Sequence, residues 1–411
     1  MTGLSQLPHD ILYIVCSELE RDLLSLCCLA RVCRSFNQAA RKLVFRHVGG
    51  VRQEKQHLLT RSFAEDPDLR SSVKSCRSFC VKYRGKIFDY GTEKALDFEK
   101  FPNLREITVQ MTSFPVDISK RPVTWNFECD IFDTCSFAGV HTINLTGPSI
   151  AVLDPTDMVR FMSLPDVRNI VAAGCDDWVS PLLQPAFIEV KTALTSLDIR
   201  GRRDTVFWSV APTSLWHILS CCPRLEHLRC HTPSYFAHLK SETGLHTMLE
   251  PIRESLKSLE LFQDYQPRPT TSGEGVLMNF SWFPTLVELH IPSRYLFLSR
   301  NSFDRSEGLH KMLPRCLRRL RVEFQKVARA AIIGTGPGDV DQATLSQSWL
   351  LELPIEKPTS FPELKEVIMV DVPRPGGQSE SLRPQWSPPD DIVETFSQAG
   401  IKLDVRLSYV R

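Results

Sequence analysis

Short segments of the chain alternate strictly between apolar and polar residues, beginning near residue 73 and recurring to the C-terminus. In the segment LEHLRC, Leu228 and Cys230 fall on one side, while His227 and Arg229 fall on the other. A period of two residues is typical of a β-strand with one buried and one solvated face. The pattern therefore predicts a series of half-buried strands.

The segments between these strands have helical spacing instead. In TSLWHILSCC the apolar residues fall at i, i+3, i+4 and i+7, which places Leu215, Ile218, Leu219 and Cys222 on one helical face. The segment SETGLHTMLEPIRESL repeats this spacing with Leu245, Met248, Leu249 and Ile252. Strands thus alternate with helices along the chain.

One strand motif recurs: a proline or turn, followed by Leu-x-x-Leu-x-Leu or a variant. Copies include FPNLREITV at 101, CPRLEHLRCH at 222, FPTLVELHI at 283, FPELKEVIMV at 361 and a degenerate AGIKLDVRLSY at 399. The leading apolar residues are Leu104, Val140, Val167, Leu194, Leu225, Leu256, Leu286, Leu317 and Leu364. Most are about 30 residues apart, near the leucine-rich-repeat period. The prediction is a solenoid; an ordinary α/β domain is the alternative.

Three stretches interrupt the period: the Pro-, Gly- and Ser-rich segments near 263–281 and 371–391, and a segment at 326–360 that contains GTGPGDVDQATLSQS and a short ordered piece expected around Trp349. We expect them to be loop insertions, which either mark the binding face of the solenoid or are tolerated surface excursions. The predicted organisation is a helical module at 1–48, a linker with a first degenerate repeat at 49–100, and the solenoid at 101–411.

The N-terminal segment has three short amphipathic patterns that predict helices. The first places Ile11, Ile14, Val15 and Leu19 on one face, and Asp22 is a candidate cap for the second. The third, RSFNQAARKLVFRHV, places Phe36, Ala39, Ala40, Leu43 and Val44 together. Some 40 residues bury their apolar surface poorly alone, so we expect a partner on one side.

Composition and charge exclude several classes of protein. The 411 residues carry 49 Lys and Arg against 48 Asp and Glu, so no basic field suggests nucleic acid or a membrane surface as partner. The sequence contains no apolar run of spanning length and no secretory signal. Its 13 cysteines read as reduced thiols, which favours a cytoplasmic or nuclear location.

Candidate chemistry in the sequence is weak. The Gly-rich GTGPGD at 334 lacks the Gly-Lys-Ser/Thr ending of a phosphate loop. Cys222, His227, Cys230 and His231 lie close in sequence, but strand alternation directs them to opposite faces, so we predict no metal site. We find no catalytic constellation and expect neither cofactor nor enzymatic activity.

The repeats resemble the irregular, proline-preceded leucine-rich repeats of F-box proteins, of the fungal type, on the segments FPNL, CPRL, FPTL and FPEL. The N-terminal stretch resembles the F-box itself through its Leu-Pro start, Asp10 to Leu12, Asp22 to Leu26 and the run RVCRSF. By this resemblance, Ile14 and Leu19 form the core of the first helix. The implied fold is a three-helix F-box module followed by a repeat solenoid, with strands on the concave face and helices on the convex face.

The resemblance implies that the chain is a substrate-recognition subunit of a Skp–cullin–F-box ubiquitin ligase. Carried over by position, the residues that bind the Skp adaptor, and through it cullin, are Leu7, Pro8, Ile11, Leu12, Leu26, Val32, Cys33 and Phe36. The alternative is a non-catalytic scaffold, whose N-terminal helices cap the solenoid or bind the adaptor without promoting ubiquitination.

A protein client would bind the polar side of the strands. Basic residues gather there at Arg200, Arg202, His227, Arg229, His290, Arg319 and Arg321. Because the forked donors of arginine suit carboxylates and phosphates, these residues predict an acidic or phosphorylated client. The alternative is that they are solvated charges at the strand surface.

Overall fold

The computed structural model describes residues 7–20, 22–48, 56–81, 101–111, 137–146, 155–173, 190–200, 212–231, 243–262, 278–296, 308–324, 348–371 and 385–408. The chain divides into two compact units. The first comprises residues 1–150 and 160–171, and the second comprises 151–159 and 172–411. Each unit is described by itself below.

The strands of each unit are parallel and follow one another in sequence order. The first unit has β1 (His47–Val48), β2 (Ser75–Val81), β3 (Glu106–Met111), β4 (Thr142–Thr146) and the start of β5 (Asn169–Ala173). The second has β6 (Ser196–Arg200), β7 (His227–His231), β8 (Ser258–Phe262), β9 (Glu288–Pro292), β10 (Arg319–Phe324), β11 (Glu366–Asp371) and β12 (Lys402–Arg406).

A short turn precedes most strands and positions the leading apolar residue. In FPTL the amide of Leu286 donates to the carbonyl of Phe283, and in FPEL the amide of Leu364 donates to that of Phe361. All four of these side chains are buried. The proline in each turn suits this geometry, because its fixed φ matches the second turn position. The recurring Phe-Pro-x-Leu motif is thus a turn that buries its first and last residues.

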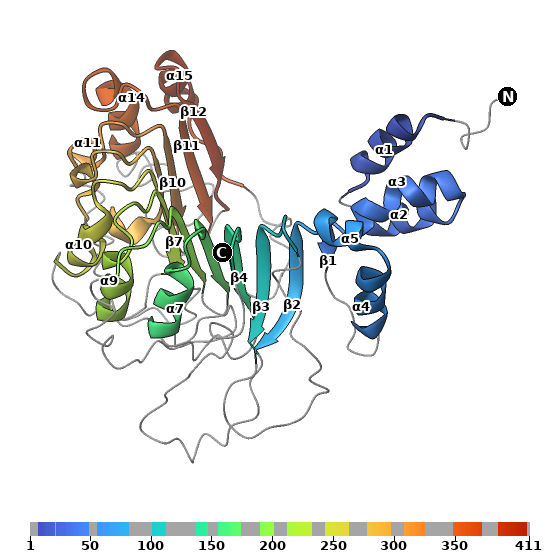
Figure 1. Ribbon diagram of the computed structural model, residues 1–411. Coiled ribbons are helices and arrows are strands. Elements are labelled where there is room, and N and C mark those ends of the chain that lie inside the picture. The colour runs from blue at the N-terminus through green and yellow to red at the C-terminus, as the bar shows by residue number, and fades with distance from the viewer. Residues whose placement is uncertain are drawn as a thin grey trace, which may run out of the picture. The chain divides into compact units, whose positions relative to one another are not determined.

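Helices lie on one side of the strands of the second unit (Figure 1). They are α9 (Pro212–Ser220), α10 (Thr243–Leu249), α11 (Leu309–Met312), α14 (Ser348–Ser360) and α15 (Asp390–Gln398), with 3-10 turns at η7 (Glu250–Ile252), η8 (Phe280–Trp282) and η9 (Ser293–Tyr295). The predicted helical faces are buried, including Leu215, Ile218 and Leu219 on α9. A further helix, α7 (Pro155–Met162), precedes β5.

Parallel strands alternating with helices on one side confirm the predicted fold class, an irregular leucine-rich-repeat solenoid behind an N-terminal helical module. The other side of the strands in the second unit carries the polar residues and is called the open face below. The core lies between strands and helices, where Leu228, Leu259, Leu289 and Leu320 are each at most 2% exposed.

The structure corrects the extent of two predicted loops. Residues 348–360 of the stretch predicted as an insertion at 326–360 form α14, in which Trp349, Leu350 and Leu353 are buried. Pro354 and Pro358 lie inside this helix, because burial of its apolar side outweighs the hydrogen bonds that proline removes. The stretch near 371–391 likewise ends in the first turn of α15. Residues 325–347 and 372–384 lie outside the described ranges.

The first unit begins with three helices, α1 (His9–Glu18), α2 (Leu23–Ala30) and α3 (Arg34–Val44). Two more helices, α4 (Gln56–Glu65) and α5 (Pro67–Ser72), occupy the segment that the sequence suggested as a linker. The Asp22 carboxylate accepts a hydrogen bond from the Ser25 amide at 3.1 Å, so this residue caps α2 as predicted. In the described parts of the chain, no helix is both long and apolar enough to cross a membrane.

The burial of the strand leucines in the repeat core leads to a prediction about the stability of the fold. We expect Leu289→Ala to lower the free energy of unfolding by about 2–5 kcal/mol, because a buried leucine loses its packing and leaves a cavity. Val393→Ala on α15, where the side chain is 46% exposed, should change it by less than about 0.5 kcal/mol. Urea unfolding followed by circular dichroism measures both; equal effects would contradict the assignment of the core.

Candidate functional site

Residues 7–48, the N-terminal module, enclose a small apolar core. Its buried members are Leu12, Cys16, Leu26, Phe36, Ala39, Ala40 and Leu43, with Tyr13, Leu19 and Leu29 packed against them. On α1 the inward residues Leu12, Cys16 and Leu19 are spaced i, i+4 and i+7, one helical stripe. The predicted inward face of α3 is confirmed, because Phe36, Ala39, Ala40 and Leu43 are all buried.

A second apolar set on the same module faces outward. Its exposed fractions are 37% for Leu7, 44% for Ile11, 55% for Ile14, 41% for Val15, 49% for Leu23, 81% for Leu24 and 65% for Val32. Cys27 and Cys28 on α2 are exposed as well. We call these side chains the apolar surface of the module. So many exposed large aliphatic residues on 42 positions mark an interaction surface rather than ordinary scatter.

The structure corrects the predicted roles of several of these residues. Leu12, Leu26 and Phe36, predicted to touch the adaptor, are at most 3% exposed and belong to the module's own core. Ile14, which the resemblance placed in the core of the first helix, is instead exposed. The cause is that α1 and α2 are apolar on both sides, so spacing alone does not show which stripe faces inward.

The remaining predicted adaptor residues lie where a partner can reach them. Leu7, Pro8, Ile11 and Val32 are exposed, and Cys33 is half-buried. Sequence reasoning left Val15, Leu23 and Leu24 out of the predicted set, although they are exposed on the same module. The signal for Leu23 and Leu24 was present in the sequence as a second helix that is apolar on more than one side.

The module is tied to the first unit's strands by a polar network around Glu20. Arg46 donates to one Glu20 oxygen, and His47 lies with its Nε2 3.0 Å from the other and its Nδ1 2.8 Å from the Ser75 hydroxyl. The hydrogen bond from Arg46 holds the pKa of Glu20 below its ordinary value. Since His47 begins β1 and Ser75 begins β2, the network fixes the end of α1 against the sheet.

Strand register brings the polar residues of the second unit into rows across the open face. One row runs Ser196, His227, Ser258, Glu288, Arg319, Glu366 and Lys402, and the next runs Asp198, Arg229, Glu260, His290, Arg321, Ile368 and Asp404. We call them the first and second rows. The sequence predicted that most of these residues would share the polar face, but it could not show which charges would meet.

The first row ends in four charges of alternating sign. Arg319 lies 3.5 Å from Glu288 and 2.8 Å from Glu366, and Lys402 lies 2.8 Å from the other oxygen of Glu366. The hydrogen bond from Lys402 lowers the pKa of Glu366 most, and the hydrogen bond from Arg319 lowers it further. Most of these side chains are half exposed, so each pair stabilises the fold by less than about 1 kcal/mol.

The second row centres on a histidine between two carboxylates. The His290 Nδ1 lies 2.7 Å from Glu260 and its Nε2 lies 2.9 Å from Glu323, a residue only 3% exposed. Burial by itself would lower the pKa of His290, but the hydrogen bonds to Glu260 and Glu323 raise it. Burial likewise opposes ionisation of Glu260, yet the hydrogen bond from His290 leaves the pKa of this carboxyl lowered. The charged forms are therefore mutually stabilised.

The basic residues predicted to hold a client are mostly neutralised by the protein's own carboxylates. Arg200 forms a forked pair with Asp198 on the same strand. The Arg229 Nε lies 2.9 Å from Glu260, and its guanidinium stacks on Phe262 with 4.5 Å to the ring centroid. His227 is exposed, 4.0 Å from Glu226. Arg202 lies outside the described residues. In the described residues, the open face is thus mostly a set of paired charges, where the sequence suggested locally basic clusters.

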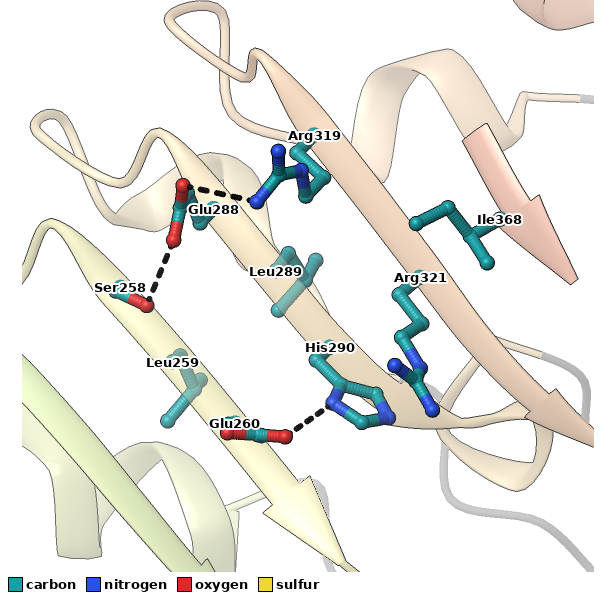
Figure 2. A pocket seen from close by; sticks show the side chains of 9 residues that line it. All are labelled: Ser258, Leu259, Glu260, Glu288, Leu289, His290, Arg319, Arg321 and Ile368. Carbon is teal, nitrogen blue, oxygen red and sulfur yellow. Dashed lines mark hydrogen bonds and ion pairs between the residues drawn. The ribbon is translucent and has the colours of Figure 1, made fainter. Parts of the chain in front are cut away.

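A shallow hollow lies on this face over β8 to β11. It is lined by Ser258, Leu259, Glu260, Glu288, Leu289, His290, Arg319, Arg321 and Ile368. Figure 2 shows the polar side chains of neighbouring strands pointing toward one another across it. Of the predicted client residues, the structure brings His290, Arg319 and Arg321 together here, while Arg200 and Arg229 lie on the strands before it.

The cysteine and histidine side chains near residue 225 point as strand alternation predicted. Cys222 and Cys230 are buried, whereas His227 is exposed. Burial raises the pKa of both thiols to about 12, so neither is poised to become a thiolate ligand or nucleophile. These cysteines act as apolar core residues.

Comparison with known proteins assigns the N-terminal module. Residues 4–49 match the family described as F-box-like, and the match ends before the repeats begin. No curated protein matches the sequence. The crystal structure of the Rad7 and Elc1 complex in yeast is similar at 13% sequence identity and a TM-score of 0.30, covering 92% of this chain and 97% of that chain. A likeness this low carries no argument about partners.

The charges around His290 predict a pH-dependent contribution to stability. Because the pKa of His290 is raised in the folded protein, the protonated side chain stabilises the fold. This contribution is fully present below the unfolded pKa of about 6.5, and it is lost as the pH rises through the folded pKa. The lowered pKa of Glu260 has the opposite sense, with its contribution lost as pH falls through that value. Between the folded pKa of Glu260 and the folded pKa of His290, we expect His290→Gln to lower the free energy of unfolding by roughly 3 kcal/mol. Outside this pH window the loss should be smaller.

Urea unfolding of both proteins across a pH series measures this difference. His227→Gln is the matched control, because it makes the same substitution on an exposed side chain of the first row. A gap between wild type and His290→Gln that stays constant with pH would show that the histidine acts only through packing.

Proposed function

We propose that the chain is a substrate-recognition subunit of a Skp–cullin–F-box ubiquitin ligase. In this role the N-terminal module docks the Skp adaptor, and through it cullin, while the open face of the repeats holds a protein client. The observation that carries the proposal is the apolar surface on a segment that matches an F-box-like family. The chain itself supplies no catalysis here; the transfer chemistry belongs to other subunits.

The apolar surface supports docking on energetic grounds. Ile11, Ile14 and Val15 on α1 and Leu23 and Leu24 on α2 are aliphatic side chains that remain 41–81% exposed. Covering such area with a partner contributes about 25 cal/mol for each square ångström removed from water. The core residues Leu12, Leu26 and Phe36 contribute indirectly, because their packing fixes the relative positions of the helices that carry the apolar surface.

The role of the repeats in this proposal is to position a client. A receptor that holds a client beside the ubiquitin-carrying enzyme replaces a bimolecular encounter between the two with a local one. A stacked array of parallel strands provides a rigid surface for this purpose, since each repeat is fixed by its neighbours. The assignment of the repeats to the fungal type of F-box protein is part of the same proposal.

Substitutions confined to the apolar surface test the docking role. We expect Ile14→Asp, Leu24→Asp and Val32→Asp together to abolish retention of the Skp adaptor by the full chain, because each places a charge in an apolar interface. Co-purification with adaptor and cullin, quantified by immunoblot, is the measurement. Because all three side chains are exposed, the helices should still fold, which circular dichroism checks.

Ile355→Asp is the matched control, since Ile355 and Val32 are both 65% exposed and Ile355 lies far along the chain on α14. This variant should retain the adaptor. Failure of the folded wild-type chain to bind any Skp adaptor would overturn the proposal and leave a repeat scaffold. Adaptor binding without cullin would support a scaffold that does not promote ubiquitination.

A further inference from the structure

Among the described residues of the open face, Arg321 lacks the pairing that the neighbouring arginines have. Arg319 lies between Glu288 and Glu366, and in the second row Arg229 lies between Asp198 and Glu260. Arg321 has His290 on one neighbouring strand and Ile368 on the other. Register therefore places no carboxylate directly opposite Arg321 on either adjacent strand.

Among the described residues, the one carboxylate within ion-pair distance of Arg321 is already engaged. Glu323 lies 3.8 Å from the Arg321 guanidinium, but the same Glu323 oxygen is 2.9 Å from His290. One negative charge thus serves two cations. Asp404, which follows Ile368 in the row, is paired with Arg406 at 2.6 Å.

A count of the connected charges leads to the same result. Starting at Arg200, the second-row network contains the cations Arg200, Arg229, His290 and Arg321 and the anions Asp198, Glu260 and Glu323. Within the described residues of this network, four positive charges face three negative ones when His290 is protonated. The excess lies at the Arg321 end, because every other cation has a closer carboxylate.

The donors of Arg321 are also incompletely used. Its Nε–H is buried and forms no hydrogen bond within the described part of the chain. The Arg229 Nε likewise lacks a well-aligned hydrogen bond, but a Glu260 oxygen lies 2.9 Å from it. A buried donor without an acceptor costs free energy that an incoming oxygen would recover. Figure 2 shows Arg321 in the hollow beside His290, with no interaction to the other residues drawn.

We propose that the hollow over β8 to β11 binds one anionic oxygen group, a carboxylate or a phosphate, on the Arg321 guanidinium. The planar donors of arginine match the paired oxygens of either group. Ile368 supplies an apolar wall beside the anion. That the anion is carried by a protein client rests on the proposed function; the anion site itself does not.

This site differs from the basic surface that the sequence suggested. Arg319 is occupied on both sides, so a second anion there would have to displace Glu288 or Glu366. The hollow therefore recognises a single acidic or phosphorylated side chain and excludes runs of them, because the surrounding Glu260, Glu288 and Glu366 repel additional negative charge.

The test is a titration of the full chain labelled with ¹⁵N-arginine, followed through its Nε–H resonances. Loss of one resonance in both Arg321→Lys and Arg321→Gln identifies Arg321. Sodium phosphate and sodium acetate are the two probes, and sodium chloride at equal ionic strength is the reference. We expect phosphate or acetate to shift the Arg321 resonance saturably, at a concentration at least about tenfold below that at which chloride has an effect.

The two probes separate the sources of the anion. A response to phosphate alone assigns a phosphorylated segment, and a response to acetate assigns an acidic side chain or C-terminus. Arg318→Gln removes the same charge three residues away, at a side chain that does not line the hollow, and should leave the response unchanged. Equal shifts with chloride, or no shift with either probe, would overturn the proposal. Because this titration needs no adaptor, its result is independent of the docking experiment.

Discussion

A single backbone carbonyl before each strand sets the geometry on which the rest of the structure depends. The Thr195 carbonyl accepts hydrogen bonds from the amides of Glu226 and His227 at 2.9 and 3.0 Å, and the Glu226 carbonyl does the same for Lys257 and Ser258. The pattern recurs at Arg46, Lys74, Arg105, His141, Lys257, Val287 and Arg318. Within each unit, neighbouring repeats with this pattern are thus joined by one shared acceptor, directly before the strand begins.

This constraint explains how irregular repeats form a regular stack. The shared acceptor and the following strand fix only about ten residues of each repeat; the segment between one strand and the next turn is free to vary in length. The leading residues Leu317 and Leu364 are therefore separated by a much longer segment than Leu286 and Leu317, yet Arg319 and Glu366 still pair in register. Loop length costs little once the ends are held.

Much of the fold follows from the sequence, because its signals are local. Alternation within five residues identified the strands, and the Phe-Pro-x-Leu segment identified the turn before them. The inward stripe of α1 did not follow, because Ile11, Ile14 and Val15 are as apolar as Leu12 and Cys16. Only the tertiary contacts with α3 decide between the two stripes. An ordered piece around Trp349 was expected, but the extent of α14 did not follow, because Pro354 and Pro358 locally disfavour a helix and are overridden by burial of Trp349 and Leu353.

The candidate client site illustrates a different limit of sequence reasoning. Arg319 and Arg321 look equivalent in RRLRV, since both point to the open face with one residue between them. Their difference arises about 30 to 50 residues away, where register places Glu288 and Glu366 beside Arg319 but His290 and Ile368 beside Arg321. A count of basic residues therefore overestimates how cationic the surface is. Because most of the charges are already paired, a client gains little from general attraction and must be recognised by the few donors that remain unpaired.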